Sequence, residues 1–119
     1  MTPGIFIRDL RVQTRIGVTA EERAESQWVL VSCELDTDPE AAASSDDVAD
    51  TVDYGVAVDR IAAVVRTGER NLLERLAGEI ADLLTSFAGV TGVTVEVSKE
   101  SPPVAEEIGG VAVRIERRA

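Results

Sequence analysis

The sequence predicts an α+β fold, in which a four-stranded and mainly antiparallel sheet carries two helices on one face. Segments with alternating apolar and polar residues occur as one pair near the start of the chain and as another pair near its end. Two segments with apolar residues at helical spacing lie between these pairs. Because 119 residues provide one compact core and little more, we expect a single domain over residues 1–119.

The first pair of strands is predicted at residues 5–16 and 28–35. In the second of them, every other residue from Val29 to Leu35 is apolar, which is the pattern of a strand with one buried face. The connection between them, residues 17–26, is rich in charge and long enough for a turn of helix. We therefore expect a long antiparallel hairpin.

The middle of the chain predicts the two helices. Residues 39–45 form a polar and alanine-rich loop or a short helical excursion, and residues 51–55 lead in extended form into a helix that Gly68 ends. The second helix opens with Asn71 as its N-cap and Glu74 three residues later, which is the spacing of a capping box. An apolar stripe follows and predicts which face of this helix packs on the sheet.

The second pair of strands follows the helices. The first of these strands has valine at every second position from Val93 to Val97, and the second covers residues 111–116. Prolines after Ser101 interrupt the sheet between them. Lys99 continues the register of the valines, so we expect its stem to point toward the apolar face.

The other face of the predicted sheet carries polar side chains, which suit contact with solvent or with a wet central channel. They are Arg11, Gln13, Arg15, Thr94, Glu96, Arg114 and Glu116. A single sheet of this size has open edges, which edge pairing between subunits would remove. We therefore expect the subunits to assemble into a closed barrel.

Lys99 is the only lysine in the chain, since the other 11 of the 12 basic residues are arginine. Arginine keeps its proton near neutrality, whereas burial beside apolar surface disfavours the charge of a lysine ammonium. A lysine kept at this one position indicates a proton-transfer group. The alternative is a strand-end lysine whose ammonium reaches solvent or protects a sheet edge.

Composition argues against several classes of function. A formal charge of −10 disfavours binding to nucleic acids and to anionic membrane surfaces. No apolar run approaches the ~18 residues of a membrane span, and the N-terminus lacks the pattern of a secretory signal, so we expect a cytoplasmic protein. The chain has no histidine, and Cys33 is its only cysteine, which is a poor ligand set for zinc. We expect no metal and no cofactor, with proton chemistry on Lys, Tyr, Glu or Asp.

Four stretches of the chain match one family in order and spacing, within a resemblance that extends over residues 5–117. They are RIGV, EER and Gln27 within residues 15–27, SDDVADTVDY at 45–54, NLLERLA at 71–77, and VSKESPP at 97–103. With these motifs the sequence resembles dihydroneopterin aldolase, the small folate-pathway enzyme of the tunnelling fold. Some family members carry histidine where this chain has Ile16, a departure that bears on side-chain preference.

The resemblance implies a retro-aldol cleavage of 7,8-dihydroneopterin into 6-hydroxymethyl-7,8-dihydropterin and glycolaldehyde. It also implies that the imine of the substrate's own ring accepts the electrons of the broken bond. Neither a lysine Schiff base nor a metal is then required. Proton transfer and substrate positioning remain for the protein.

Three catalytic residues follow from the resemblance. Lys99 would be the general base, acting through a water on the side-chain hydroxyl. Tyr54, the only tyrosine, would relay or donate a proton to the enol intermediate. Glu22 would contact the hydroxylated side chain of the substrate. Without the resemblance, Tyr54 is more simply a packing residue at a helix start, and Glu22 is a solvated charge in an acidic loop.

Four further residues are implied to bind the pterin. The Glu74 carboxylate would accept the paired N–H groups of the aminopyrimidinone edge, a role that competes with the capping box. Backbone groups of Leu73, Val52 and Asp53 would add contacts.

The resemblance further implies a homo-oligomer, a tetrameric ring or an octamer, with active sites between subunits. The nearest alternative is a 2′-epimerase of the same family that acts on dihydroneopterin or its triphosphate. From other classes, a non-catalytic pterin-binding ring protein or a small interaction module remains open.

Overall fold

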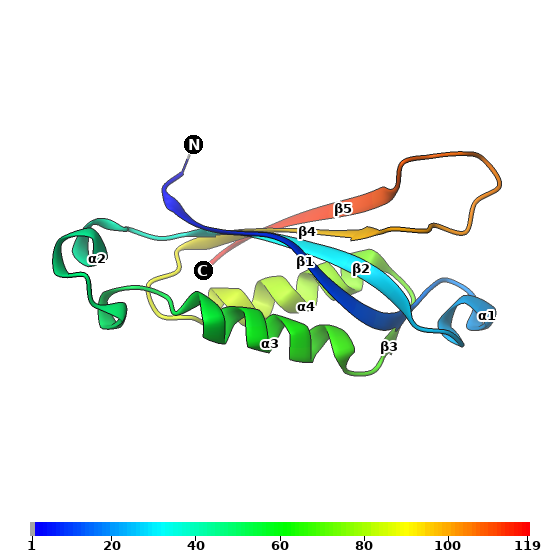
Figure 1. The fold of residues 1–119 in the computed structure, drawn as a ribbon, viewed down its shortest axis with the longest axis horizontal. Helices are drawn as coiled ribbons and strands as arrows, with labels where there is room; N and C mark the ends of the chain where they lie inside the picture. Colours follow the sequence, from blue (N-terminus) through cyan, green and yellow to red (C-terminus); the bar gives the residue numbers. More distant parts are fainter. Residues whose placement is uncertain (1) are drawn as a thin grey trace.

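A five-stranded sheet forms one layer of the molecule, and the two long helices cover one of its faces (Figure 1). The structure, a computed structural model, describes residues 2–119. Its elements are β1 (Gly4–Ile16), α1 (Ala20–Arg23), β2 (Gln27–Asp36), α2 (Glu40–Ser45), the 3-10 helix η1 (Val48–Asp50), α3 (Tyr54–Arg66), β3 (Glu69–Arg70), α4 (Leu73–Thr85), β4 (Gly92–Lys99) and β5 (Val111–Arg118). The strand order is β3-β1-β2-β4-β5. The predicted α+β class, with two helices on one face of a mainly antiparallel sheet, is confirmed.

The prediction of four strands misses β3. Its two residues pair in parallel with Arg15 and Ile16 at the end of β1, and the backbone N–H of Gly17 donates to the carbonyl of Arg70 at 3.0 Å. Two residues are too few to show an alternating pattern, so nothing in the sequence marks this strand. Its pairing closes one edge of the sheet at the end of β1.

The predicted capping box at the start of α4 is wrong. The N-cap is Leu72, in extended conformation, and no side chain bonds the first turn of the helix. Asn71 lies in a bend between the end of β3 at Arg70 and the N-cap Leu72, so it stands outside the helix. The carboxylate of Glu74, exposed in the first turn, is therefore not engaged in a box with Asn71.

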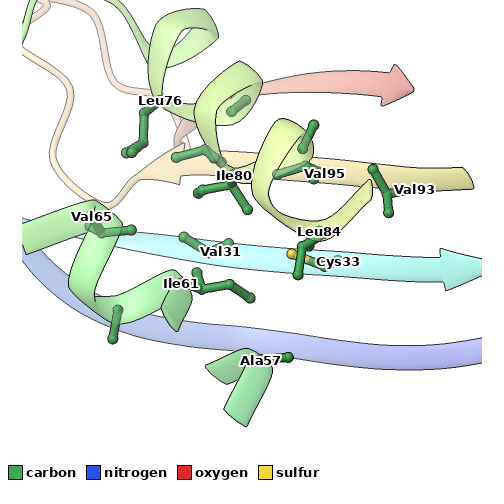
Figure 2. Packing of buried hydrophobic residues seen from close by; sticks show 14 of the residues in the cluster. Val31, Cys33, Ala57, Ile61, Val65, Leu76, Ile80, Leu84, Val93 and Val95 are labelled. Atoms are coloured by element: carbon green, nitrogen blue, oxygen red, sulfur yellow. The ribbon is translucent and has the colours of Figure 1, made fainter. Parts of the chain in front are cut away.

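Side chains from the sheet and from both long helices build the core. Figure 2 shows Val31 and Cys33 of β2 in one cluster with Ile61 of α3, Leu84 of α4 and Val95 of β4. Every second residue of β2 and β4 is buried, as the alternating pattern predicts. Burial of these faces provides the main driving force for holding the helices on the sheet. None of the helices within residues 2–119 has the length and apolar character to cross a membrane.

The pairing register fixes which residues meet at each end of the sheet. Asp36 pairs with Gly92 at one end of the β2–β4 ladder, and Val29 pairs with Lys99 at the other. The first loop after β1 also lies at the Lys99 end, because Gln27 at the start of β2 pairs with Thr14. We call this the lysine end of the sheet, and the end around Asp36 the opposite end.

Candidate active site

Lys99 and Glu22 form an ion pair that is nearly closed to solvent. The Nζ atom of Lys99 lies 2.8 Å from Oε2 of Glu22, and the two side chains are 10% and 12% exposed. Lys99 is the last residue of β4 and keeps the valine register, so its stem runs along the apolar face as predicted. Glu22 is carried by α1, whose N-cap Thr19 accepts a hydrogen bond from the Glu22 backbone N–H at 3.1 Å.

Gln27 and Gly17 hold the Glu22 carboxylate in place. The amide of Gln27 donates to Glu22 Oε2 at 3.0 Å and to the carbonyl of Ile16 at 2.6 Å, which ties the carboxylate to the end of β1. A Cβ atom at position 17 would lie 2.3 Å from Glu22 Oε1, so only glycine leaves room for the carboxylate. Arg23 then fixes the loop by donating to the carbonyl of Gly17 at 2.9 Å.

The environment of Glu22 favours its ionised form. Burial raises the pKa of the carboxyl, but hydrogen bonds from Lys99 and Gln27, the charge of Lys99 and a backbone hydrogen bond at Val18 outweigh that effect. The pKa of Glu22 therefore lies below its ordinary value. A fixed carboxylate beside a sheltered amine can hold a proton at Nζ and accept hydrogen bonds from a polyol side chain.

Glu74 and Leu73 lie at the lysine end of the sheet. Helix α4 packs on β4 and β5, and Gly78 of this helix lies beside Ile115, which pairs with Val95. The chain leaves α4 and enters β4 at Gly92, which lies at the opposite end of the sheet. The first turn of α4 therefore lies toward the lysine end (Figure 1). Leu73 is buried there, and Glu74 is exposed.

Tyr54, Val52 and Asp53 lie far from that end. Val52 lines a cavity of about 270 Å³ with Thr37 and Asp38, just beyond the end of β2. Helix α3 starts at Tyr54 and has 13 residues, so it carries the chain about 20 Å before it ends near β3. Asp53 serves as the N-cap of α3, and the Tyr54 side chain is 69% exposed. One chain therefore brings together Lys99 and Glu22 but not Tyr54.

The sequence patterns did not single out the role of Gln27. It stands in the apolar register of β2, two residues before Val29. A polar residue in an apolar register is a signal that sequence analysis can use, because burial of an unpaired polar group is costly.

The described part of the chain contains neither a cluster of potential metal ligands nor a reactive thiol. Within residues 2–119, no group of three or more His, Cys, Asp or Glu side chains is arranged to hold a metal ion. Burial raises the pKa of the Cys33 thiol to about 12, in keeping with its predicted place in the core.

The fold and the sheltered pair define the class first: an α+β protein with a sheltered lysine–glutamate pair at one end of its sheet. The sequence model of the family described as Dihydroneopterin aldolase (FolB) matches residues 5–116. The chain therefore belongs to the dihydroneopterin aldolase family.

Individual relatives agree with the family match. A dihydroneopterin aldolase of Streptococcus pyogenes serotype M3 is 38% identical over 86% of this chain and 87% of its own length. The Streptomyces coelicolor enzyme is 36% identical over 95% of both chains. The crystal structure of E. coli dihydroneopterin aldolase in complex with neopterin has a TM-score of 0.89 and 34% identity, covering 98% of this chain and 99% of that one. These findings confirm a carbon–carbon lyase and favour the aldolase over the epimerase and the non-catalytic alternatives.

Proposed function

We propose that the lysine end of the sheet is the active site at which 7,8-dihydroneopterin is cleaved to 6-hydroxymethyl-7,8-dihydropterin and glycolaldehyde. The sheltered Lys99–Glu22 pair carries this proposal, because it places an amine, a group that can act as a general base, next to a carboxylate whose pKa is lowered. The neopterin held by the E. coli relative supports a pterin as the ligand of this chain as well.

The proposed reaction starts when Lys99, through a water, removes the proton of the 2′-hydroxyl of the substrate. The electrons of that O–H bond form the aldehyde of glycolaldehyde, and the C1′–C2′ bond breaks. Its electron pair enters the ring imine and leaves an enol intermediate. Proton return to the enol carbon, donated or relayed by Tyr54, gives the hydroxymethyl product. Glu22 orients the polyol by accepting its hydroxyl protons, and no metal or cofactor enters any step.

The pterin ring is proposed to lie over the first turn of α4. The exposed carboxylate of Glu74 stands where the backbone N–H groups of the helix start are free, and Glu74 can accept two parallel N–H bonds from an aminopyrimidinone. The backbone of Leu73 lies one residue earlier. The absence of a capping box leaves both oxygens of Glu74 available for this contact.

A second subunit is proposed to complete the site with Tyr54, Val52 and Asp53. Tyr54 is a large aromatic residue left exposed at the opposite end of the molecule, about one α3 length from Lys99. Val18 and Leu72 are apolar and exposed at the lysine end, where such a partner would dock. Repetition of this head-to-tail contact would build a ring, as a tetramer or stacked octamer, whose sheets close into a barrel.

Product analysis tests the reaction. The protein is incubated with 7,8-dihydroneopterin, and glycolaldehyde, the hydroxymethyl product and the 2′-epimer are separated by chromatography. We expect glycolaldehyde and 6-hydroxymethyl-7,8-dihydropterin in equal amounts. Epimer as the main product would favour the epimerase, and turnover of neither kind would overturn the proposed function.

Mixing two inactive variants tests the shared site. Lys99→Met and Tyr54→Ala remove residues from the two halves, so each homo-oligomer is expected to be inactive. After joint unfolding and refolding, roughly a quarter of the sites should carry both intact residues if subunits mix at random. Recovery of activity supports a site between subunits, and a mixture as inactive as its components contradicts it.

A further inference from the structure

Thr14 is a buried polar residue whose hydrogen-bonding capacity the fold does not use. Its side chain is 4% exposed. Among the side chains of residues 2–119, its hydroxyl oxygen is the one buried polar atom without a hydrogen-bond partner. A buried hydroxyl without a partner lowers stability, whereas valine, which has nearly the same shape, would not. Thr14 therefore requires an explanation other than packing.

The strand register places Thr14 on the same face and at the same end of the sheet as Lys99, with β2 between their two strands. Thr14 stands directly opposite Gln27, and Val29, two residues further along β2, stands opposite Lys99. Directly opposite residues share a face of the sheet with Cβ atoms about 4.5–5.5 Å apart. Residues two apart on one strand also share a face, at a separation of about 7 Å. All four side chains thus project from the helix-covered face at the same end.

The ammonium of Lys99, like the hydroxyl of Thr14, has hydrogen-bonding capacity that the described residues do not use. Its ammonium has three donors, and within the described residues Glu22 Oε2 is its protein acceptor. That oxygen also accepts a hydrogen bond from the amide of Gln27, the residue directly opposite Thr14, so the two donor nitrogens meet at one carboxylate oxygen. A hydroxyl can accept from an ammonium and donate to a neutral amine or to a water, so it suits a group that changes its protonation state.

We propose that the Thr14 hydroxyl positions the water through which Lys99 exchanges protons with the substrate. Thr14 is then a positioning residue, because it acts through that water and through Lys99 and does not contact the reacting atoms. This inference rests on the proposed role of Lys99 as the general base. It explains why a hydroxyl is retained where valine would pack equally well: stability is given up for placement of the relay.

Thr14→Val and Thr14→Ser test this role in steady-state turnover of 7,8-dihydroneopterin. Thr14→Val keeps the volume and removes the hydroxyl, so kcat should fall by at least about tenfold while KM changes little, since a misplaced relay slows the chemical step only. Thr14→Ser keeps the hydroxyl and should restore most of kcat. Thermal unfolding should show Thr14→Val to be as stable as the wild type or more stable.

A matched control separates the hydroxyl from the substitution itself. Thr94→Val makes the same change in a strand, on the polar face of β4 away from the pair, and should leave kcat unchanged. Wild-type kcat in Thr14→Val, or equal losses in Thr14→Val and Thr14→Ser, would overturn the inference. If Thr14→Val fails to fold, Thr14→Ala compared with Thr14→Ser decides in the same way. A wild type without turnover refutes the proposed function instead, so the two failures are distinguishable.

Discussion

Replacement of Lys99 by arginine separates the two roles that a buried cation can have in this site. Arginine keeps the positive charge opposite Glu22, whose Oε2 lies 2.8 Å from Lys99 Nζ, but it cannot give up its proton near neutrality. If Lys99 serves only as an electrostatic partner, Lys99→Arg should remain active. If Lys99 is the general base, the variant should bind pterin and fail to cleave it.

The size of the effect follows from the geometry of the pair. Loss of a positioned general base lowers kcat by about 10²–10⁴-fold, or about 3–5 kcal/mol of transition-state stabilisation. Lys99→Met additionally leaves Glu22, which is 12% exposed, without its cation while Gln27 still donates to it. Loss of one hydrogen bond to a buried charge should cost about 1–3 kcal/mol of folding stability. Lys99→Arg should lose less.

Two measurements on each variant decide whether Lys99 is a general base or only an electrostatic partner of Glu22. Glycolaldehyde release gives kcat, and fluorescence titration with neopterin gives the affinity for the ring. Arg114→Met is the control, because it removes an exposed cation 2.9 Å from Glu96 on the polar face and should change neither quantity. Turnover of Lys99→Arg within threefold of the wild type would refute the assignment of the base.

Three further predictions concern stability and reactivity. Because the pKa of Glu22 is lowered on folding from its ordinary 4.5, its contribution to stability is present above that pH and is lost as the pH falls through the folded pKa. The difference in urea midpoint between wild type and Glu22→Gln should therefore shrink below about pH 4.5, and a constant difference would contradict this. With its pKa raised to about 12, the thiol of Cys33 should react with iodoacetamide at pH 8 far more slowly in the folded protein than in urea; equal rates would show that it is not buried. Arg70 is bonded to Glu79 with its side chain 8% exposed and also donates to the carbonyl of Val64, so Arg70→Ala should cost about 1–3 kcal/mol in urea unfolding. Arg75→Ala, which removes the exposed partner of the same carboxylate, should cost less than about 1 kcal/mol, and similar losses for both would refute the burial argument.

Local pattern predicted most of the secondary structure. The alternation in β2 and β4 and the helical spacing in α3 and α4 each report that one face of an element is buried, and neighbours in sequence are enough to see this. The same reasoning placed Lys99 on the apolar face, where it is found. The start of α4 was misjudged because residues 69–70 form β3, whose pairing with β1 is not local, and the helix begins only after the bend at Asn71 and the extended Leu72.

By itself, then, the sequence determined the α+β class and which residues of each strand face the core. It also placed Lys99, the one lysine of the chain, on that apolar face. Only the tertiary structure decided that Lys99 meets Glu22, which lies 77 residues away in the chain, and that Thr14 is left without a partner. It also decided that Tyr54 lies a helix length away from both. The physical reason is that periodicity records whether a side chain is buried, whereas the identity of its neighbours depends on strand order and register, which the whole chain sets together.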